Sequence, residues 1–190
     1  TWPAPGSGVG TSPSCSTVQS GFRVSVIREY AGVGPAGPML ETKPADWRWI
    51  VDVNVLGVAY GVLAFGPILK KRGEGHIINT ASEAGHVSSA ALGMYTATKH
   101  AITGLTKTIA LDGRPFNIAC GQLDIGNADT NMGGRMKAGV PQPRGDIMPE
   151  PVFDVTHCGS AIRYMASLPL DTNVLFMTIK ATNMPFEGRG

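Results

Sequence analysis

The feature that most constrains the fold is an alternation of short β-branched segments with longer amphipathic ones. Residues 75–80 form a β-branched run that begins with a glycine, which is typical of a buried strand. Residues 93–112 follow with the apolar spacing of a long amphipathic helix. Strands that alternate with helices in this way predict an α/β fold with a parallel sheet and right-handed crossovers.

The same alternation runs along most of the chain and predicts the remaining elements. Strands are expected at about 23–28, 75–80, 116–123 and 173–179. Helices are expected at about 45–71, 93–112 and 155–167, the first of them buried because its apolar stretch at 55–69 has no charge. Residues 82–92 and 124–150 are expected to be loops.

Three polar residues of this pattern suggest an active site. Tyr95 and Lys99 lie four residues apart in the expected helix, so their side chains share one face. The ammonium beside the phenol favours the phenolate, so we expect a lowered Tyr95 pKa. Ser82, just after a strand, could hydrogen-bond a carbonyl oxygen while Tyr95 transfers a proton. The same Tyr–Lys spacing also occurs in helices as a solvated pair, and it is the preceding strand that favours the active-site interpretation.

A strand that delivers Ser82, followed by a helix with Tyr95 and Lys99, resembles the short-chain dehydrogenase/reductase family. Two other segments agree with the resemblance. Residues 53–57 match the family's V-N-x-x-G helix motif, and residues 31–32 keep the Ala-Gly of its Asn-Asn-Ala-Gly turn. The resemblance implies a Rossmann-like, doubly wound parallel sheet.

The N-terminal part departs from the family pattern. We expect a poorly structured Gly/Ser/Pro-rich leader at 1–21 and a single α/β domain at 22–190. The family begins with a strand, a Gly-rich turn and a helix that together hold the cofactor pyrophosphate. The candidate turn here, at residues 6–10, has no hydrophobic strand before it and no clear helix after it. We therefore expect an N-terminally truncated or atypical member without a recognisable phosphate-binding βαβ half, and a degenerate phosphate turn at 6–10 is the alternative.

The resemblance implies a catalytic set of Asn54, Ser82, Tyr95 and Lys99. Tyr95 is then the proton donor and acceptor, and Ser82 orients the reacting oxygen. Lys99 lowers the Tyr95 pKa and hydrogen-bonds the nicotinamide ribose, while Asn54 holds a water that links Lys99 to solvent.

Cofactor contacts are also implied by the resemblance, from Gly32, Tyr95, Lys99 and Ile125. Ile125 is the best match to the residue that contacts the nicotinamide carboxamide, although the family's Pro-Gly pair is absent. A nicotinamide cofactor is needed because no side chain can transfer a hydride. The choice between NAD and NADP stays open, since the strand that usually decides it is not recognisable.

These features predict an NAD(P)-dependent oxidoreductase that interconverts a carbonyl and an alcohol on a small molecule. The alternative is a cofactor-deficient remnant that acts as a non-catalytic dimerising protein, because family members pair through the two long helices. A homodimer or homotetramer is expected in either case. Residues 128–150 are interpreted as a mobile loop over the substrate or as an ordinary surface loop.

Composition argues against several other classes of protein. The net charge is only +2, and residues 70–72 are the one basic run, so we expect no nucleic-acid partner. Three widely spaced cysteines without a C-x-x-C pair argue against a disulfide framework and against a metal site. They favour a reducing, cytoplasmic location. No secretory signal is visible, and the apolar stretch at 55–69 is shorter than a membrane span, so no membrane partner is expected.

Overall fold

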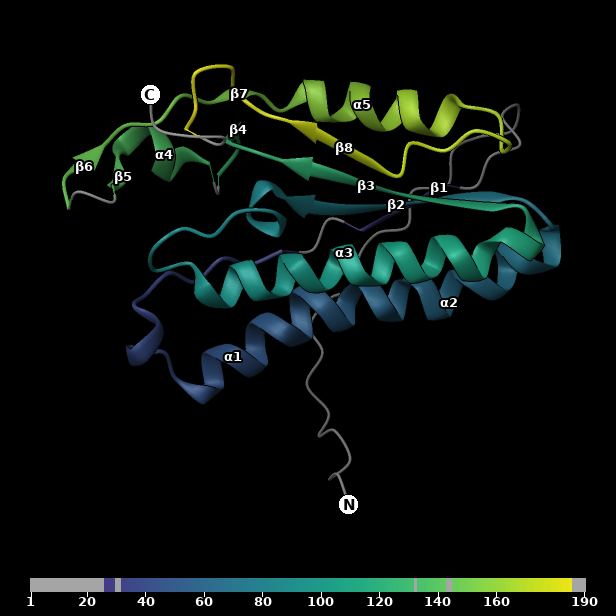
Figure 1. Cartoon of the computed structure of the whole chain (residues 1–190), viewed down its shortest axis with the longest axis horizontal. Helices are drawn as coiled ribbons and strands as arrows, with labels where there is room; N and C mark the ends of the chain where they lie inside the picture. Colours follow the sequence, from purple (N-terminus) through teal and green to yellow (C-terminus); the bar gives the residue numbers. More distant parts are fainter. Residues whose placement is uncertain (1–25, 30–31, 132, 143–144, 186–190) are drawn as a thin grey trace.

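The computed structural model describes residues 26–29, 32–131, 133–142 and 145–185 (Figure 1). The expected leader at 1–21 and the candidate phosphate turn at 6–10 lie outside the described residues.

A parallel sheet forms the centre of the described structure. Its strand order is β1 (Val26–Glu29), β2 (Gly75–Ser82), β3 (Ile118–Ile125) and β8 (Phe176–Ile179). The main helices are α1 (Pro44–Val51), α2 (Gly57–Arg72), α3 (Gly93–Gly113) and α5 (Thr156–Ser167). Figure 1 shows α2 and α3 on one face of the sheet and α5 on the other. The predicted α/β fold with a parallel sheet is therefore confirmed.

The core lies on both faces of β2, because successive side chains of a strand point to opposite sides. Ile77 packs with Leu69 of α2 and with Cys120 of β3. Its neighbour Ile78 packs with Ile162 and other residues of α5. A strand buried on both faces needs a continuous apolar run, and this is why residues 75–80 could be recognised from the sequence.

The predicted helix at 45–71 is present but contains an irregular segment. Residues Asp52–Leu56 form a π-helical turn between α1 and α2. π-turns inside α-helices are rare and are frequently found at functional sites. Asn54 lies within this turn and is buried, so the irregularity sits where the sequence predicts a site residue.

The expectation that this helix is buried is wrong. Val58 and Leu69 of α2 are buried, but Tyr60, Leu63 and Ile68 are 61%, 70% and 55% exposed. By length and composition alone, the helix from Pro44 to Arg72 could cross a membrane, because an 18-residue window of it has a mean hydropathy of 1.6, and 17% of that window is buried. The expectation that its apolar stretch is too short therefore does not hold for the whole helix.

Several boundaries differ from those expected. β2 continues through Ser82, so the predicted loop begins after that residue. β3 begins at Ile118 because a 3-10 turn (Arg114–Phe116) ends in Asn117, whose φ of 55° is left-handed. β8 begins later than predicted, at Phe176.

The segment at 124–150 contains secondary structure that was not predicted. A short parallel pair joins β4 (Ala128–Asp129) to β7 (Phe153–Asp154), and β5 (Val140–Pro141) pairs antiparallel with β6 (Ile147–Met148). Along the chain, α4 (Gly134–Ala138) lies between β4 and β5. Two- to five-residue elements are too short for a periodic sequence signal, so the prediction of a plain loop is wrong here.

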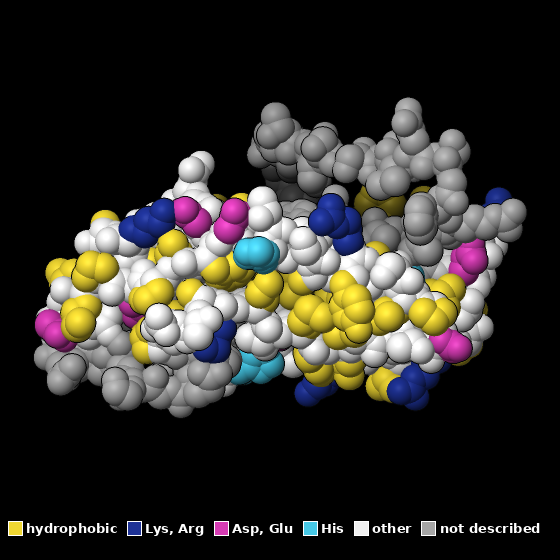
Figure 2. Space-filling model, turned by 90° about the horizontal axis from the view of Figure 1, so that it is seen from above, with side chains coloured by type: hydrophobic (Ala, Val, Ile, Leu, Met, Phe, Trp, Pro, Cys, Tyr) yellow, Lys and Arg dark blue, Asp and Glu magenta, His cyan; other side chains and the backbone are white. Residues whose placement is uncertain are grey.

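The face that carries α5 presents apolar side chains to its surroundings. Figure 2 looks down on this face and shows a band of hydrophobic side chains with charged residues around it. Tyr164 of α5 is 53% exposed, and Val155, which precedes α5, is 43% exposed. Exposed apolar residues are thus found on both helical layers of the described structure.

Candidate active site

Strand β2 and helix α3 place the predicted residues at the same end of the sheet. Ser82 is the last residue of β2, and its hydroxyl caps the short turn that follows (Glu83–Gly85) by accepting a hydrogen bond of 3.3 Å from the Ala84 amide. Tyr95 and Lys99 lie in the first turns of α3. Because parallel strands end at the same edge, this edge is where α/β folds bind ligands.

The Ser82 side chain lies close enough to the Tyr95 phenol to influence its pKa. Burial of the phenol raises the Tyr95 pKa, and this effect outweighs that of Ser82, which lowers the pKa. The negative charge of Glu83 also raises the Tyr95 pKa. The expectation of a lowered Tyr95 pKa is therefore wrong, because desolvation is the largest contribution.

Lys99 is buried beside the tyrosine, with 4% of its surface exposed. Its ammonium lies 5.5 Å from the centre of the Tyr95 ring and donates a hydrogen bond of 3.4 Å to the Thr80 carbonyl. Burial lowers the pKa of Lys99 to about 8, and the charge of Asp124 acts in the opposite direction. Lys99 can therefore lose or gain a proton close to neutral pH, which an exposed lysine cannot do.

Asn54 fixes the loop after β1 to the helical layer. Its side-chain amide donates to the Val33 carbonyl at 2.9 Å and to the Thr98 hydroxyl at 3.1 Å. Its carbonyl oxygen accepts from the Val33 amide at 2.9 Å. Both amide hydrogens of Asn54 are thus used by protein atoms. The resemblance implies a water-binding role for Asn54, whereas no sequence pattern indicates this contact with Val33.

Of the four residues expected to contact a cofactor, the structure brings Tyr95 and Lys99 together. Gly32 immediately precedes Val33, whose backbone is hydrogen-bonded to Asn54. A Cβ atom on the nearby Gly34 would lie 3.6 Å from the Tyr95 ring. Ile125 ends β3 opposite Ser82 in the strand register, and its side chain packs into the core next to α5. The lack of a side chain at Gly34 leaves only backbone beside the Tyr95 ring at this position.

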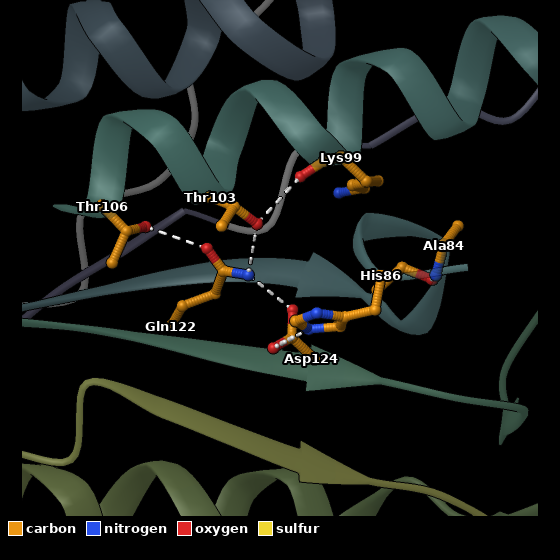
Figure 3. A network of polar contacts seen from close by, with 8 residues as sticks. Ala84, His86, Lys99, Thr103, Thr106, Gln122 and Asp124 are labelled. Atoms are coloured by element: carbon orange, nitrogen blue, oxygen red, sulfur yellow. Dashed lines mark hydrogen bonds and ion pairs between the residues drawn. The ribbon is translucent and has the colours of Figure 1, made fainter. Parts of the chain in front are cut away.

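A polar network that the sequence does not predict lies between α3 and the sheet, beside Lys99 (Figure 3). Gln122 donates to Asp124 at 2.6 Å and to Thr103 at 3.1 Å. His86 lies 2.8 Å from the other carboxylate oxygen of Asp124. The signal for this network was two polar residues, Gln122 and Asp124, on the same face of a strand that is otherwise apolar.

Two cavities elsewhere in the described structure do not touch this constellation. One of about 450 Å³ is lined by residues from the end of β8 onward, including Lys180, by residues at the start of β7, and by His157 in the first turn of α5. The other, of about 680 Å³, lies between the end of α3 and the segment before β8, and includes Lys107 and Arg114. Among the described residues, no group of three or more His, Cys, Asp or Glu side chains could hold a metal ion.

The sequence is similar to those of known dehydrogenases and reductases. Residues 15–140 match the family described as short chain dehydrogenase. A 3-alpha-(or 20-beta)-hydroxysteroid dehydrogenase of Mycobacterium tuberculosis is 34% identical over 128 residues, 67% of this chain and 45% of that protein. A diacetyl reductase, (S)-acetoin forming, of Staphylococcus epidermidis is 33% identical over 115 residues, 60% of this chain and 45% of that protein. The chain thus spans about half the length of the curated relatives it matches.

Solved structures share the fold. An alcohol dehydrogenase from the archaeon Thermococcus sibiricus, complexed with 5-hydroxy-NADP, matches with a TM-score of 0.70 at 24% identity, over 85% of this chain and 64% of that chain. A gluconate 5-dehydrogenase from Burkholderia cenocepacia, in complex with NADP and tartrate, matches with a TM-score of 0.69 at 24% identity, over 81% and 62%. At these identities the likeness shows the fold alone, but the family match covers more than half of the sequence. The chain belongs to the short chain dehydrogenase family.

Proposed function

We propose that this chain contains the proton-transfer site of an NAD(P)-dependent oxidoreductase that interconverts a carbonyl and an alcohol on a small molecule. The observation that supports it most directly is the buried Lys99 ammonium 5.5 Å from the centre of the Tyr95 ring, with Ser82 at the end of β2 acting on the same phenol. Two hydroxyls at one site can both contact a single substrate oxygen.

In the reduction direction, Tyr95 donates a proton to the substrate oxygen while Ser82 hydrogen-bonds the same atom. The raised pKa of Tyr95 keeps the phenol protonated at neutral pH, as a proton donor requires. In the oxidation direction the phenolate must form, and the neighbouring Lys99 ammonium stabilises that negative charge. Asn54 clamps the loop at Val33, and a water between Asn54 and Lys99 is a further part of the proposal.

The cofactor would be held by Gly32, Tyr95, Lys99 and Ile125 and would supply the hydride. Lys99 donates hydrogen bonds and suits the ribose hydroxyls, while the backbone at Gly32 and Ile125 borders the same edge of the sheet. We leave NAD and NADP as equal candidates. The named relatives act on a steroid and on diacetyl, so the substrate proposal stays at the class of small carbonyls and alcohols.

We also propose that the chain forms a homodimer or homotetramer through α2 and α3. The exposed apolar residues Tyr60, Leu63 and Ile68 recur at helical spacing along α2, and Leu111 of α3 is 55% exposed. An apolar stripe of this kind marks an interaction surface. The same stripe is the observation that favours the second candidate function, a cofactor-deficient protein that only dimerises.

A cytoplasmic location is part of the proposal. Cys120 and Cys158 are free and buried, and burial raises the pKa of Cys120 to about 12. A thiol with so high a pKa is unreactive at neutral pH. These two cysteines therefore support a reducing compartment and give no support to thiol chemistry.

A thermal-shift titration with NADH and NADPH tests the proposal against the dimer-only alternative. A ligand that binds only the folded chain stabilises it by about 2.7 kcal/mol at a hundredfold excess over Kd. We expect a rise in Tm with one or both cofactors and a smaller rise in Lys99→Met, which lacks the ribose donor. No rise with either cofactor would favour the protein that only dimerises.

A further inference from the structure

A fully buried carboxylate lies in the layer between the sheet and α3. Asp124 of β3 has no exposed surface. One of its oxygens accepts a hydrogen bond of 2.6 Å from the Gln122 side chain, and the other lies 2.8 Å from Nε2 of His86. Because a carboxylate only accepts, the His86 ring donates to it. A buried carboxylate is costly unless it meets such donors or a positive charge.

The lysine on which the Asp124 charge acts is Lys99. Its ammonium reaches the backbone carbonyl of Thr80 in β2. The next residue of β2, Ala81, is paired with Asp124 in the β2–β3 register. Neighbouring strands lie only about 4.8 Å apart, so the ammonium and the carboxylate occupy adjacent positions on the same face of the sheet. Figure 3 shows both side chains in the space between α3 and the strands.

The carboxylate is held in place by a chain of hydrogen bonds. Thr106 donates to the Gln122 carbonyl oxygen at 3.1 Å and accepts from Asn79 at 2.9 Å. The Gln122 amide group also donates to Thr103, one turn along α3 from Lys99. Because both ends of the Gln122 carboxamide are engaged, its orientation toward Asp124 is fixed.

Burial alone would make Lys99 a poor cation. Removing an ammonium from water favours its neutral form, and a nearby negative charge favours the charged form. The other titratable groups around this position are Tyr95 on the same helix, Glu83 in the turn that follows β2, and His86 beyond Asp124. Glu83 acts on Tyr95, so Asp124 is the carboxylate whose charge acts on Lys99.

We propose that Asp124 is a positioning residue that keeps Lys99 in its ammonium form beside Tyr95, with Gln122 and His86 holding the carboxylate in place. The inference deepens the proposed function, because an ammonium at Lys99 is what stabilises the phenolate and donates to a ribose. Asp124 itself touches neither substrate nor cofactor in this account.

The test is an NMR titration of Lys99 in the full chain without added substrate or cofactor. The ε-carbon signal of Lys99, in protein with isotope-labelled lysine, is assigned by its loss in Lys99→Arg. We expect Asp124→Asn to move the titration midpoint of Lys99 down by about one pH unit. The matched control Asp129→Asn removes an exposed carboxylate paired with Lys137 and should leave the midpoint unchanged. A folded Asp124→Asn variant with the original Lys99 midpoint would overturn the proposal.

A second measurement uses the unaltered protein, in case Asp124→Asn does not fold. Coupling between two charges is reciprocal, so the Asp124 γ-carbon signal should show a step at the pH where Lys99 titrates. That step should be absent in Lys99→Met. A flat Asp124 signal across the Lys99 titration contradicts the proposal. Both readouts are independent of turnover. Coupling between Lys99 and Asp124 in an inactive chain would therefore contradict only the proposed redox function.

Discussion

The Asn54 side chain is hydrogen-bonded to both backbone polar atoms of Val33, each at 2.9 Å. This pairing joins the π-helical turn to the loop after β1, although the two residues are far apart in the sequence. The neighbouring Gly34 lies against the Tyr95 ring. The position of this loop relative to the tyrosine therefore depends on one buried carboxamide.

Replacing Asn54 with alanine should loosen that loop. The substitution leaves the Val33 N–H and C=O without these partners, and an unsatisfied buried polar group costs about 1–3 kcal/mol. We expect a lower free energy of unfolding in urea and faster hydrogen exchange at the Val33 amide. Asn131→Ala, at an exposed position, is the control and should change neither. Unchanged exchange at Val33 would show that Asn54 does not hold the loop.

Replacing Lys99 with methionine should stabilise the fold while removing function. The folded-state pKa of about 8 lies below the ordinary 10.5, so the unfolded chain binds the proton more tightly. The wild type therefore gains stability as the pH rises from about 8 to 10.5, and Lys99→Met lacks this gain. At pH 7 the variant should be more stable by about 1–3 kcal/mol.

The measurement is urea unfolding of both proteins across this pH range. The stability difference should shrink as the pH approaches 10.5. Lys71→Met, at an exposed lysine, should follow the wild type throughout. A Lys99→Met variant that is less stable than the wild type at every pH would contradict the assigned burial penalty.

His76 should make the fold sensitive to acid. Burial lowers the pKa of His76 below 6.5, and its Nε2 is buried without a hydrogen-bond partner among the described residues. The neutral ring is favoured in the folded state, so its stabilising effect is present above pH 6.5 and is lost as the pH falls below it. In His76→Leu, stability should fall less between pH 7 and 5 than in the wild type. His100→Gln, on the exposed face of α3, should behave like the wild type.

Leu63→Glu should disrupt the proposed dimer. A charge in the centre of the apolar stripe on α2 would have to be desolvated on association. Light scattering should show a shift from dimer or tetramer toward monomer, whereas Ile147→Glu, at a residue 71% exposed on β6, should leave the oligomer intact. An unchanged oligomer in Leu63→Glu would mean that the chain associates through another surface.

Periodic segments could be predicted from the sequence, and contacts between distant segments could not. The apolar run at 75–80 and the helix at 93–112 were recognisable because burial on both faces and helical spacing leave a repeating pattern. The π-turn at 52–56 leaves no such pattern, since it inserts a single irregular turn into a helix. The short elements between 128 and 154 are below the length at which periodicity can be detected.

In the candidate site too, features of single periodic segments could be predicted, and contacts between distant segments could not. The placement of Ser82, Tyr95 and Lys99 at one end of the sheet could be predicted because one strand and one helical turn determine their relative positions. The direction of the Tyr95 pKa was not, because it depends on how much water the folded chain excludes from the phenol. Asp124 could not be predicted as part of the site, because its position relative to Lys99 depends on the pairing of β3 with β2.

The most direct test of the central claim is hydride transfer by Tyr95→Phe. NADH or NADPH oxidation is followed with a panel of small ketones and diketones, beside Ser82→Ala and the conservative Tyr60→Phe at an exposed tyrosine. Loss of general acid catalysis should lower kcat in Tyr95→Phe by about a hundredfold or more, with cofactor-induced thermal stabilisation retained, while Tyr60→Phe keeps full activity. Wild-type turnover in Tyr95→Phe would contradict the account.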